Sequence, residues 1–210
     1  MTGRRFWSVV IMKDAVQPKT TRDAILDATD RLLARYGYKK MTIDDLASEV
    51  GIGKGSVYLH FSSKEEIALT HIDRIIERLK ENLRLIAAKP SKPDDRLRRM
   101  LTERVLFRFD SVQHYKKSLD EMLSYVRPQL LDRRKRYFEQ EAQIFSTVIK
   151  DGQKSSLFVK GDPLDMALTL ISATNSLLPY SLIAVELDDR DDIEARTEKT
   201  AKLLIKGLSR

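Results

Sequence analysis

The chain has 210 residues, no cysteine and a formal net charge of +7. This length allows one compact domain, or a small domain joined to a larger one. The lack of cysteine excludes disulfides and thiolate metal sites and fits a reducing compartment, so we expect a cytoplasmic protein. The positive charge favours polyanions such as nucleic acid, but a solvated surface explains it equally well.

The first residues combine a basic start with a short apolar run. Arg4 and Arg5 precede the apolar stretch 6–12, which resembles a stunted secretory or twin-arginine signal. The run is too short for such a signal, and no small-residue cleavage site follows it. We therefore interpret residues 1–18 as a flexible N-terminal arm, with Met12 as an alternative start.

A first helix is predicted to begin after Thr20. Thr20 and Asp23 have the spacing of a helix cap and its partner at the third helical position. Gly37 is suited to end this helix, because glycine takes the left-handed conformation without steric cost. Apolar side chains recur between these limits at helical spacing: Ile25, Ala28, Leu32, Leu33 and Tyr36.

Residues 42–64 have the pattern of two short helices joined by a tight turn. Thr42 and Asp45 again have the capping spacing, and Gly51 is placed to end the first of the two helices. In the second helix Val57 and Phe61 are the predicted buried positions, and Leu59 is a third candidate. The pattern predicts a helix-turn-helix. The exposed face of its second helix carries side chains that suit a DNA groove, namely Lys54, Ser56, Tyr58 and His60.

The rest of the chain shows helical periodicity without the alternation that is typical of strands. A long helix is predicted from Lys64 to about Ala88, and the proline-containing stretch 89–93 ends it. Further helices are expected over 94–109, over 119–126 with an end before Pro128, over 128–150, from Pro163 through the apolar stretch 166–185, and over 191–208. The fold class is therefore predicted to be all-α.

The segment from Thr42 to Glu66 resembles the DNA-binding motif of the TetR (tetracycline repressor) family. The glycine-rich turn, the pair Tyr58 and Phe61, and the cap Ser63-Lys64-Glu65-Glu66 occur together as in that family. With the preceding helix, the resemblance covers residues of about 20–70. It implies an N-terminal three-helix helix-turn-helix DNA-binding domain over 19–65 and a larger C-terminal helical ligand-binding and dimerisation domain over 66–210.

The resemblance also implies roles for individual residues in DNA binding. Contacts with the groove are expected from Lys54, Ser56 and Tyr58, and contacts with phosphates from Thr42, His60 and Lys64, while Gly53 and Gly55 allow close approach of the backbone. Tyr58 has an alternative role as a packed aromatic that anchors its helix. His60 is not expected to bind a metal, because no second histidine or carboxylate has a matching spacing.

Polar residues among the apolar helices of the larger domain are the candidates for a ligand site. They are Arg104, Arg108, Tyr125, Tyr137 and Asn175. Such residues are more often surface groups or core groups with satisfied hydrogen bonds. That the ligand is small and often apolar is implied by the resemblance alone.

The last two helices are the candidates for dimerisation. The helix from Pro163 is apolar on nearly every side, and Ala167, Ser172, Ala173 and Ser176 would let a partner helix approach closely. The alternative is a central core helix within one subunit. The resemblance implies that these two helices pair with their copies in a homodimer.

Together these features predict a transcriptional repressor that leaves a palindromic operator in double-stranded DNA when an unknown small-molecule effector binds. A DNA-binding regulator without a ligand is the nearest alternative. A helical enzyme is poorly supported, because nucleophile elbows, phosphate loops and zinc motifs are missing from the sequence, and no cofactor or catalytic residue is expected. A membrane-surface protein that uses the basic arm is a third alternative, although we expect no membrane partner.

Overall fold

The computed structural model describes residues 20–182 and 189–210, and the regular elements within these ranges are helices. The predicted all-α class is confirmed. The N-terminal arm predicted over 1–18 lies outside the described residues. The elements are α1 (Thr21–Lys40), α2 (Ile43–Val50), α3 (Lys54–His60), α4 (Lys64–Ala87), α5 (Pro93–Val112), the 3-10 helix η1 (Gln113–Ser118), α6 (Leu119–Lys154), α7 (Pro163–Ala173), the 3-10 helices η2 (Asn175–Leu177) and η3 (Pro179–Ser181), and α8 (Arg190–Leu208).

Helix α1 begins where its sequence predicts, but Gly37 interrupts the helix and does not end it. The hydroxyl of Thr20 accepts a hydrogen bond from the backbone N–H of Asp23, and the carboxylate of Asp23 accepts one from the N–H of Thr20. Gly37 has a φ of 76° and interrupts the regular helix, which resumes for a last turn. Tyr36, the last of the apolar side chains at helical spacing, does not join the core: it is 47% exposed, and Tyr38 is buried instead. The left-handed residue between them changes the direction in which the following side chains point.

Helices α2 and α3 form the expected helix-turn-helix. Thr42 and Asp45 make a reciprocal capping box, and Gly51 ends α2 with left-handed backbone angles. Val57 and Phe61 are buried as predicted, whereas Leu59 is 84% exposed. Leu59 lies two residues after Val57 and therefore about 200° further around the helix, so Val57 and Leu59 cannot face the same core.

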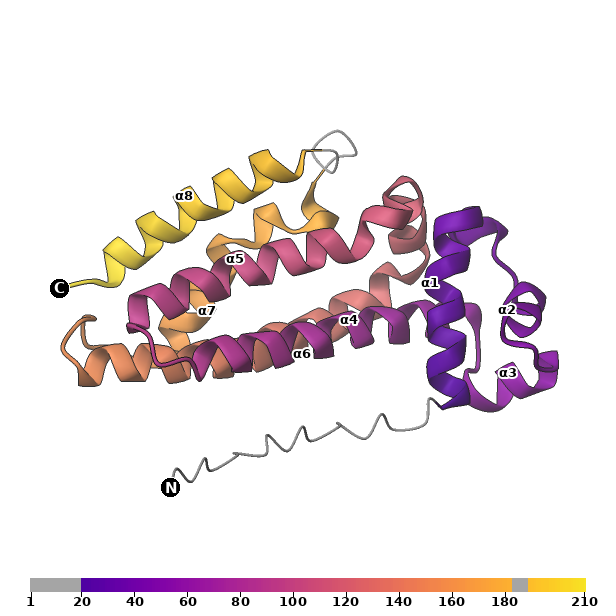
Figure 1. Cartoon of the computed structure of the whole chain (residues 1–210), viewed down its shortest axis with the longest axis horizontal. Helices are drawn as coiled ribbons and strands as arrows, with labels where there is room; N and C mark the ends of the chain where they lie inside the picture. The colour runs from indigo at the N-terminus through magenta and orange to yellow at the C-terminus, as the bar shows by residue number, and fades with distance from the viewer. Residues whose placement is uncertain (1–19, 183–188) are drawn as a thin grey trace, which may run out of the picture.

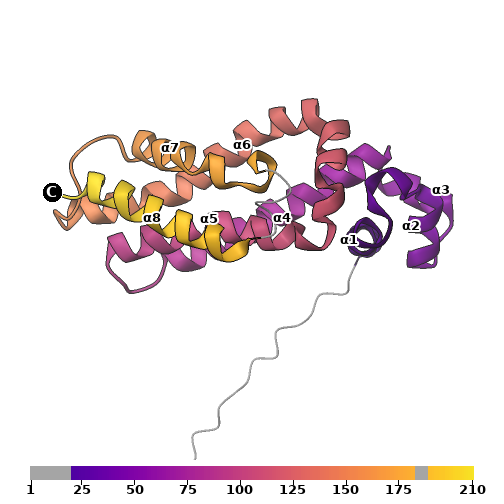
Figure 2. The same ribbon diagram turned by 90° about the horizontal axis from the view of Figure 1, so that it is seen from above.

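A continuous hydrophobic cluster joins the first three helices to the larger domain. It contains Ile25 and Leu33 from α1 together with Phe109 from α5 and Met122 from α6. Helix α4 runs out of the three-helix unit and along the larger domain (Figures 1 and 2). The molecule is elongated in both views, and α2 and α3 stand at one end of it. A movement of α4 therefore bears directly on the position of α3.

The predicted break before Pro128 is wrong. Helix α6 runs without interruption from Leu119 to Lys154 and contains Pro128. Proline removes one backbone donor and usually ends or kinks a helix. Here Pro128 is exposed, and the helix on both sides of it is held by buried side chains, Val126 before it and Tyr137 after it. Tertiary packing on both sides outweighs the local cost.

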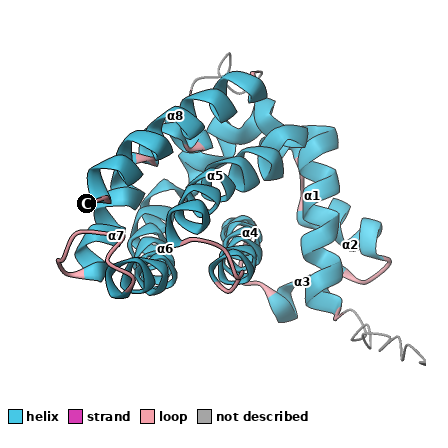
Figure 3. Cartoon of the chain, turned by 60° about the vertical axis from the view of Figure 1, so that its left-hand side comes forward, coloured by secondary structure: helices cyan, strands magenta, loops and turns pink. Residues whose placement is uncertain are grey.

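Helix α7 is shorter than expected. It ends at Ala173, and the predicted continuation through 185 is replaced by η2 and η3 up to Ser181, while 183–188 lie outside the described residues. Helix α7 packs along α6, and α8 packs along α5 (Figure 3). Within the described ranges no helix combines the length and apolar character needed to cross a bilayer.

Candidate DNA-binding surface and effector pocket

The outer face of α3 carries exposed side chains on a firmly held helix. Tyr58 is 49% exposed and Leu59 84% exposed, and Lys54 is also exposed. The buried side chains of Val57 and Phe61 fix the inner face. In addition, Arg22 of α1 donates a hydrogen bond of 2.8 Å to the carbonyl of His60, and its guanidinium lies 4.3 Å from the centre of the Phe61 ring. These contacts hold the outer face of α3 in position without a bound partner.

The glycines of this region have no explanation in the packing of the chain itself. A Cβ added at Gly53 or Gly55 would meet no atom within 4 Å. Neither residue has a positive φ, unlike Gly37 and Gly51. This space leaves room for a partner to come close to the backbone, and the close approach of DNA at these two positions remains a prediction.

Two of the expected DNA contacts already have partners within the chain. The ammonium of Lys54 lies 2.7 Å from the carboxylate of Asp44, and this hydrogen bond raises the Lys54 pKa. Both side chains are exposed, and such pairs exchange readily. The hydroxyl of Thr42 donates to Asp45 at 2.7 Å and accepts from its N–H, so it is occupied by the capping box. Lys54 is thus the more available of the two.

The side chain of Lys64 is partly buried, and its ammonium makes hydrogen bonds within the chain. Its ammonium donates to the carbonyl of Met41 at 2.9 Å and to that of Lys39 at 3.3 Å, and lies 4.4 Å from the centre of the Tyr38 ring. Burial lowers its pKa. This lysine ties α4 to the segment between α1 and α2, and its expected phosphate contact remains a prediction.

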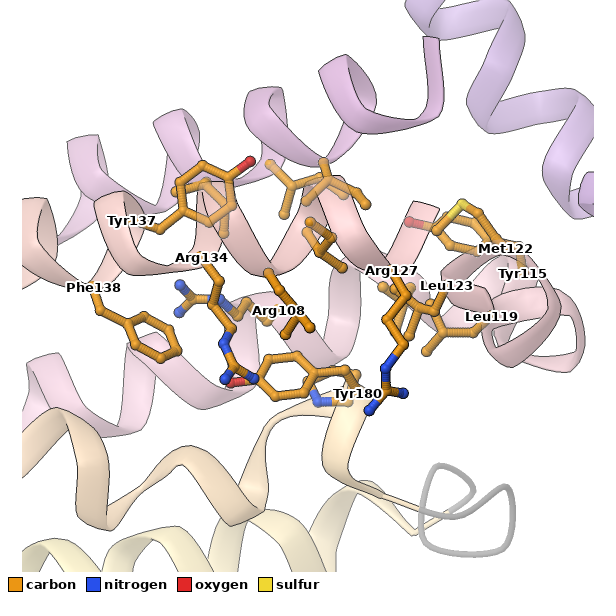
Figure 4. A pocket seen from close by; sticks show the side chains of 17 residues that line it. Arg108, Tyr115, Leu119, Met122, Leu123, Arg127, Arg134, Tyr137, Phe138 and Tyr180 are labelled. Atoms are coloured by element: carbon orange, nitrogen blue, oxygen red, sulfur yellow. The ribbon is translucent and has the colours of Figure 1, made fainter. Parts of the chain in front are cut away.

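A cavity of about 160 Å³ lies in the larger domain, bounded by α4, α5, η1, α6 and η3 (Figure 4). Seventeen of the described residues line it, and most of these are apolar. Two of the five predicted ligand residues, Arg108 and Tyr137, are among them. The hydroxyl of Tyr137 donates to Asp73 of α4, which also pairs with Arg133. Tyr137 therefore offers the cavity its ring and not its hydroxyl.

Arg104 and Asn175 do not line this cavity. They belong to a buried hydrogen-bond network in which Arg104 donates to Asn175. Arg104 is fully buried and donates to Glu141 at 2.7 Å, to Thr174 at 2.8 Å and to Asn175 at 2.8 Å. Arg108 pairs with the other carboxylate oxygen of Glu141. Burial alone would raise the pKa of Glu141, but the two arginines outweigh it and hold that pKa below the ordinary value. This network joins α5, α6 and the end of α7.

Tyr125, the fifth predicted ligand residue, also lies outside the cavity. Its side chain is 50% exposed, and its ring packs against Tyr38 with 5.2 Å between the ring centres. The contact joins α6 to the end of α1. Nothing in the sequence distinguished this tyrosine from one that faces a ligand.

Four polar lining residues are not among the five predicted ones, namely Tyr115, Arg127, Arg134 and Tyr180. Arg127 and Arg134 are seven residues apart and share a helix face with Leu123 and Leu130. That spacing could have revealed them, but the expected break at Pro128 hid it. Tyr180 follows Pro179 in a 3-10 turn, where no periodic pattern marks it.

A chain of polar contacts runs from the cavity to α1. Tyr115 lines the cavity, and its hydroxyl lies 3.2 Å from Nε2 of His71. The same Nε2 lies 3.6 Å from Asp30 of α1, and Nε2 of the exposed His114 lies 3.4 Å from that carboxylate. Burial lowers the pKa of His71 to about 3, so this ring is neutral at neutral pH. In the part of the chain that is described, no group of three or more side chains could hold a metal ion.

The N-terminal region matches a known family model. Residues 25–70 fit the model described as "Bacterial regulatory proteins, tetR family". The HTH-type transcriptional regulator EthR of Mycobacterium tuberculosis is 34% identical over 71 residues, which are 34% of this chain and 33% of EthR. The uncharacterized HTH-type transcriptional regulator YerO of Bacillus subtilis is 37% identical over 75 residues, which are 34% of this chain and 26% of YerO. The matched segments thus span less than half the length of these relatives.

The whole fold is shared with solved structures. A transcriptional regulator from Cytophaga hutchinsonii has a TM-score of 0.72 at 19% identity, covering 89% of this chain and 97% of that one. A TetR-family transcriptional regulator from Pectobacterium atrosepticum has a TM-score of 0.69 at 17% identity, covering 90% and 94%. At these identities the likeness concerns the arrangement of the helices.

Proposed function

Because this chain belongs to the tetR family of bacterial regulatory proteins, we propose that it is a homodimeric transcriptional regulator that binds a palindromic DNA operator through α3. The observation that carries the proposal is the outer face of α3. It presents Lys54, Tyr58 and Leu59 at the end of the molecule, beside two glycines that leave open space. Lysine can donate to a guanine edge, and apolar groups can contact a thymine methyl.

Of the DNA contacts predicted from the sequence, Lys54 is kept as a groove contact, and the predicted phosphate contacts Thr42 and Lys64 receive a mainly structural role. Lys54 exchanges Asp44 for DNA, whereas Thr42 and Lys64 act mainly by holding the ends of α2 and α4 in place. His60 is half-buried at the end of α3, and its side chain is a secondary candidate. Base contacts from α3 are therefore few, and DNA shape contributes to specificity.

Dimerisation is proposed through the outer sides of α7 and α8. Thr169, Ser172, Ala173 and Ser176 are exposed or half-exposed, and Leu203 of α8 is 64% exposed. Many apolar residues of the Pro163 region belong to the core of the single chain, as do Ala167, Leu170, Ile171 and Leu177. An isologous dimer would place two α3 helices about one DNA turn apart, roughly 34–36 Å.

The function is tested by selecting duplex DNA from a random pool with the purified chain, then titrating the selected duplex against a scrambled one. We expect a palindromic site, and weaker binding by Tyr58→Ala and Lys54→Ala. Matched controls are Tyr125→Ala, which removes an equally exposed tyrosine, and Lys89→Ala, which removes an exposed lysine of the loop after α4. Binding that follows only salt concentration, with no selected sequence, would refute the proposal.

The dimer is tested separately by sedimentation velocity. Leu203→Asp is expected to give monomers, while Leu85→Asp, at a leucine of α4 that is 67% exposed, leaves the dimer intact. A dimer that persists in Leu203→Asp would refute this interface.

The cavity beside α4 supports effector control of DNA binding. An effector acts only if it binds the DNA-released arrangement more tightly than the DNA-bound one. The contacts from Tyr115 through His71 to Asp30 give the cavity a physical link to α1. The link is tested by comparing the effector-induced release of DNA between the native chain and Tyr115→Phe, a variant that keeps the ring and removes the hydroxyl. A smaller release in the variant is expected, and an equal release would refute the link.

A further inference from the structure

Among the described residues, the charges around the cavity are of one sign. In that part of the chain the lining contains three arginines, Arg108, Arg127 and Arg134, and no aspartate or glutamate. The remaining lining is largely apolar, with Ile72 and Ile76 from α4 and Leu119 and Met122 from the start of α6. A cavity of about 150 Å³ lined by apolar side chains is large enough for benzene, so one of 160 Å³ accepts an apolar group of at least that size.

The three arginines differ in how they are neutralised. Arg108 is buried and pairs with Glu141, a carboxylate that also serves Arg104. Neither Arg127 nor Arg134 has an ion pair with any other described residue. Asp73, which follows the lining residue Ile72 in α4, is paired with Arg133 and accepts a hydrogen bond from Tyr137. Two positive charges at the cavity are therefore left for an outside anion.

A hydroxyl without a partner stands beside one of these charges. The hydroxyl oxygen of Tyr180 is buried and makes no hydrogen bond with the described residues. The guanidinium carbon of Arg134 lies 5.4 Å from the centre of the Tyr180 ring. In Figure 4 the side chains of Arg127 and Arg134 extend from α6 in the same direction, toward the segment that carries Tyr180. Burial raises the pKa of Tyr180, so the hydroxyl keeps its proton and can donate it to an acceptor.

An unpaired guanidinium and a buried unsatisfied hydroxyl both gain from the same kind of group. A carboxylate has two acceptor oxygens, and charge-assisted hydrogen bonds to it are among the stronger ones in proteins. A buried hydroxyl left without an acceptor costs free energy that such a group would restore. An amine would face positive charge, and a neutral alcohol would leave the guanidinium without a counterion.

We propose that the effector of this regulator is an amphipathic carboxylate, whose anionic group binds Arg134 and the Tyr180 hydroxyl near Arg127, and whose apolar tail lies against Ile72, Ile76, Leu119 and Met122. The assignment rests on the proposed function, in which this cavity is the effector site. The anionic end then lies between the middle of α6 and η3, and the tail lies between α4 and the start of α6. The carboxylates in the test differ in tail length, because the length that fits this apolar part has to be found by titration.

The experiment is calorimetric titration of the full chain, without DNA, with hexanoate, octanoate and decanoate, and with 1-octanol and octylammonium as an uncharged and a cationic match. We expect at least one carboxylate to bind, the alcohol to bind about ten- to a hundredfold more weakly, and the amine not to bind. Binding by none of the carboxylates, or equal binding of octanoate and 1-octanol, would overturn the proposal.

Single substitutions show whether the charge of Arg134, and not a general change of the fold, determines the carboxylate affinity. Arg134→Met keeps an apolar stem of similar length and is expected to lower carboxylate affinity about tenfold or more, with little change for the alcohol. Tyr180→Phe should act in the same direction and more weakly. Arg136→Met is the control, since it removes an exposed arginine of α6 that does not line the cavity. A carboxylate affinity unchanged in Arg134→Met would refute the assigned position.

The outcome is independent of DNA binding. If selection yields an operator but no carboxylate binds, the ligand class is wrong and the regulator remains. If a carboxylate binds with the expected dependence on Arg134 but no operator is selected, the site stands and the proposed function fails.

Discussion

The hydroxyl of Tyr115 lies 3.2 Å from Nε2 of His71, and this contact joins the wall of the cavity to a buried imidazole beside α1. Tyr115 faces the cavity with its ring, and His71 faces Asp30 of α1 at 3.6 Å. The two rings also meet edge to face, with their centres 5.8 Å apart. A shift of either side chain therefore changes the contacts between the cavity wall and α1.

The buried imidazole makes stability depend on pH. Its pKa is about 3 in the folded chain and about 6.5 when unfolded, so below pH 6.5 the unfolded state binds a proton that the folded state does not. The stability contribution is complete above pH 6.5 and decreases by about 1.4 kcal/mol for each pH unit below 6. Arg74, Arg78 and His114 act in the same direction as burial, and Asp27 opposes them.

The measurement is urea unfolding between pH 7 and pH 5, in the native chain and in His71→Gln. The variant should lose part of the pH dependence, because its amide does not titrate. Gln129→Ala, at an exposed residue of α6 that does not titrate, should keep the native slope. Equal slopes in the native chain and His71→Gln would contradict the prediction.

Gly55→Ala is expected to separate stability from DNA binding. An added Cβ meets no atom of the chain, and alanine favours a helix over glycine by up to about 1 kcal/mol. The variant should therefore be slightly more stable in urea and bind the selected duplex more weakly, because the methyl occupies space that the DNA approaches. Gly207→Ala in α8 also has open space and should gain stability. Because Gly207 lies one turn from Leu203 of the proposed dimer interface, sedimentation velocity first checks that this variant is dimeric, and its DNA affinity should then be unchanged. Unchanged DNA affinity in Gly55→Ala would mean that the backbone of α3 does not come close to the groove.

Glu141→Gln is expected to destabilise the fold by about 3–5 kcal/mol, because it leaves two buried guanidiniums without their counterion. Urea unfolding measures the change. Glu194→Gln, which breaks the exposed pair with Arg190, should cost about 1 kcal/mol or less. A loss of comparable size in the two variants would show that the buried network adds nothing beyond a surface pair.

Lys64→Gln distinguishes a structural tie from a phosphate contact. The native ammonium donates to two carbonyls, so the variant should lose about 1–3 kcal/mol in urea unfolding. The dependence of DNA affinity on salt should keep its slope, since that slope counts the phosphates neutralised. Lys40→Gln, at an exposed lysine, should leave stability unchanged within about 0.5 kcal/mol. A reduced slope with unchanged stability in Lys64→Gln would assign this lysine to DNA.

The parts of the fold that follow local rules could be predicted from the sequence. The capping boxes at Thr20 and Thr42 and the left-handed Gly51 depend on residues three or fewer positions apart. The helix-turn-helix therefore followed from the residues themselves. The course of α6 through Pro128 did not, because it depends on buried side chains from other helices packing on both sides of the proline.

The site divides in the same way. The exposed face of α3 follows from helical spacing, once Leu59 is placed opposite Val57. The ligand residues do not follow, because Arg104 and Asn175 are adjacent only through the packing of α5 against the end of α7. Tyr125 and Tyr137 have similar sequence surroundings, yet one packs on Tyr38 and the other lines the cavity. Contacts between distant segments decide such cases.

Pro128 interrupts the hydrogen-bond ladder of α6 within the stretch that lines the cavity, which extends from Leu119 to Phe138. Bending a helix where a backbone donor is already missing breaks no further hydrogen bond. The wall of the cavity thus has a built-in joint, while the half of α6 that carries Glu141 stays clamped to α5. We expect compounds longer than the resting cavity to be admitted by opening at this joint, so that one chain senses a series of homologous molecules with graded strength.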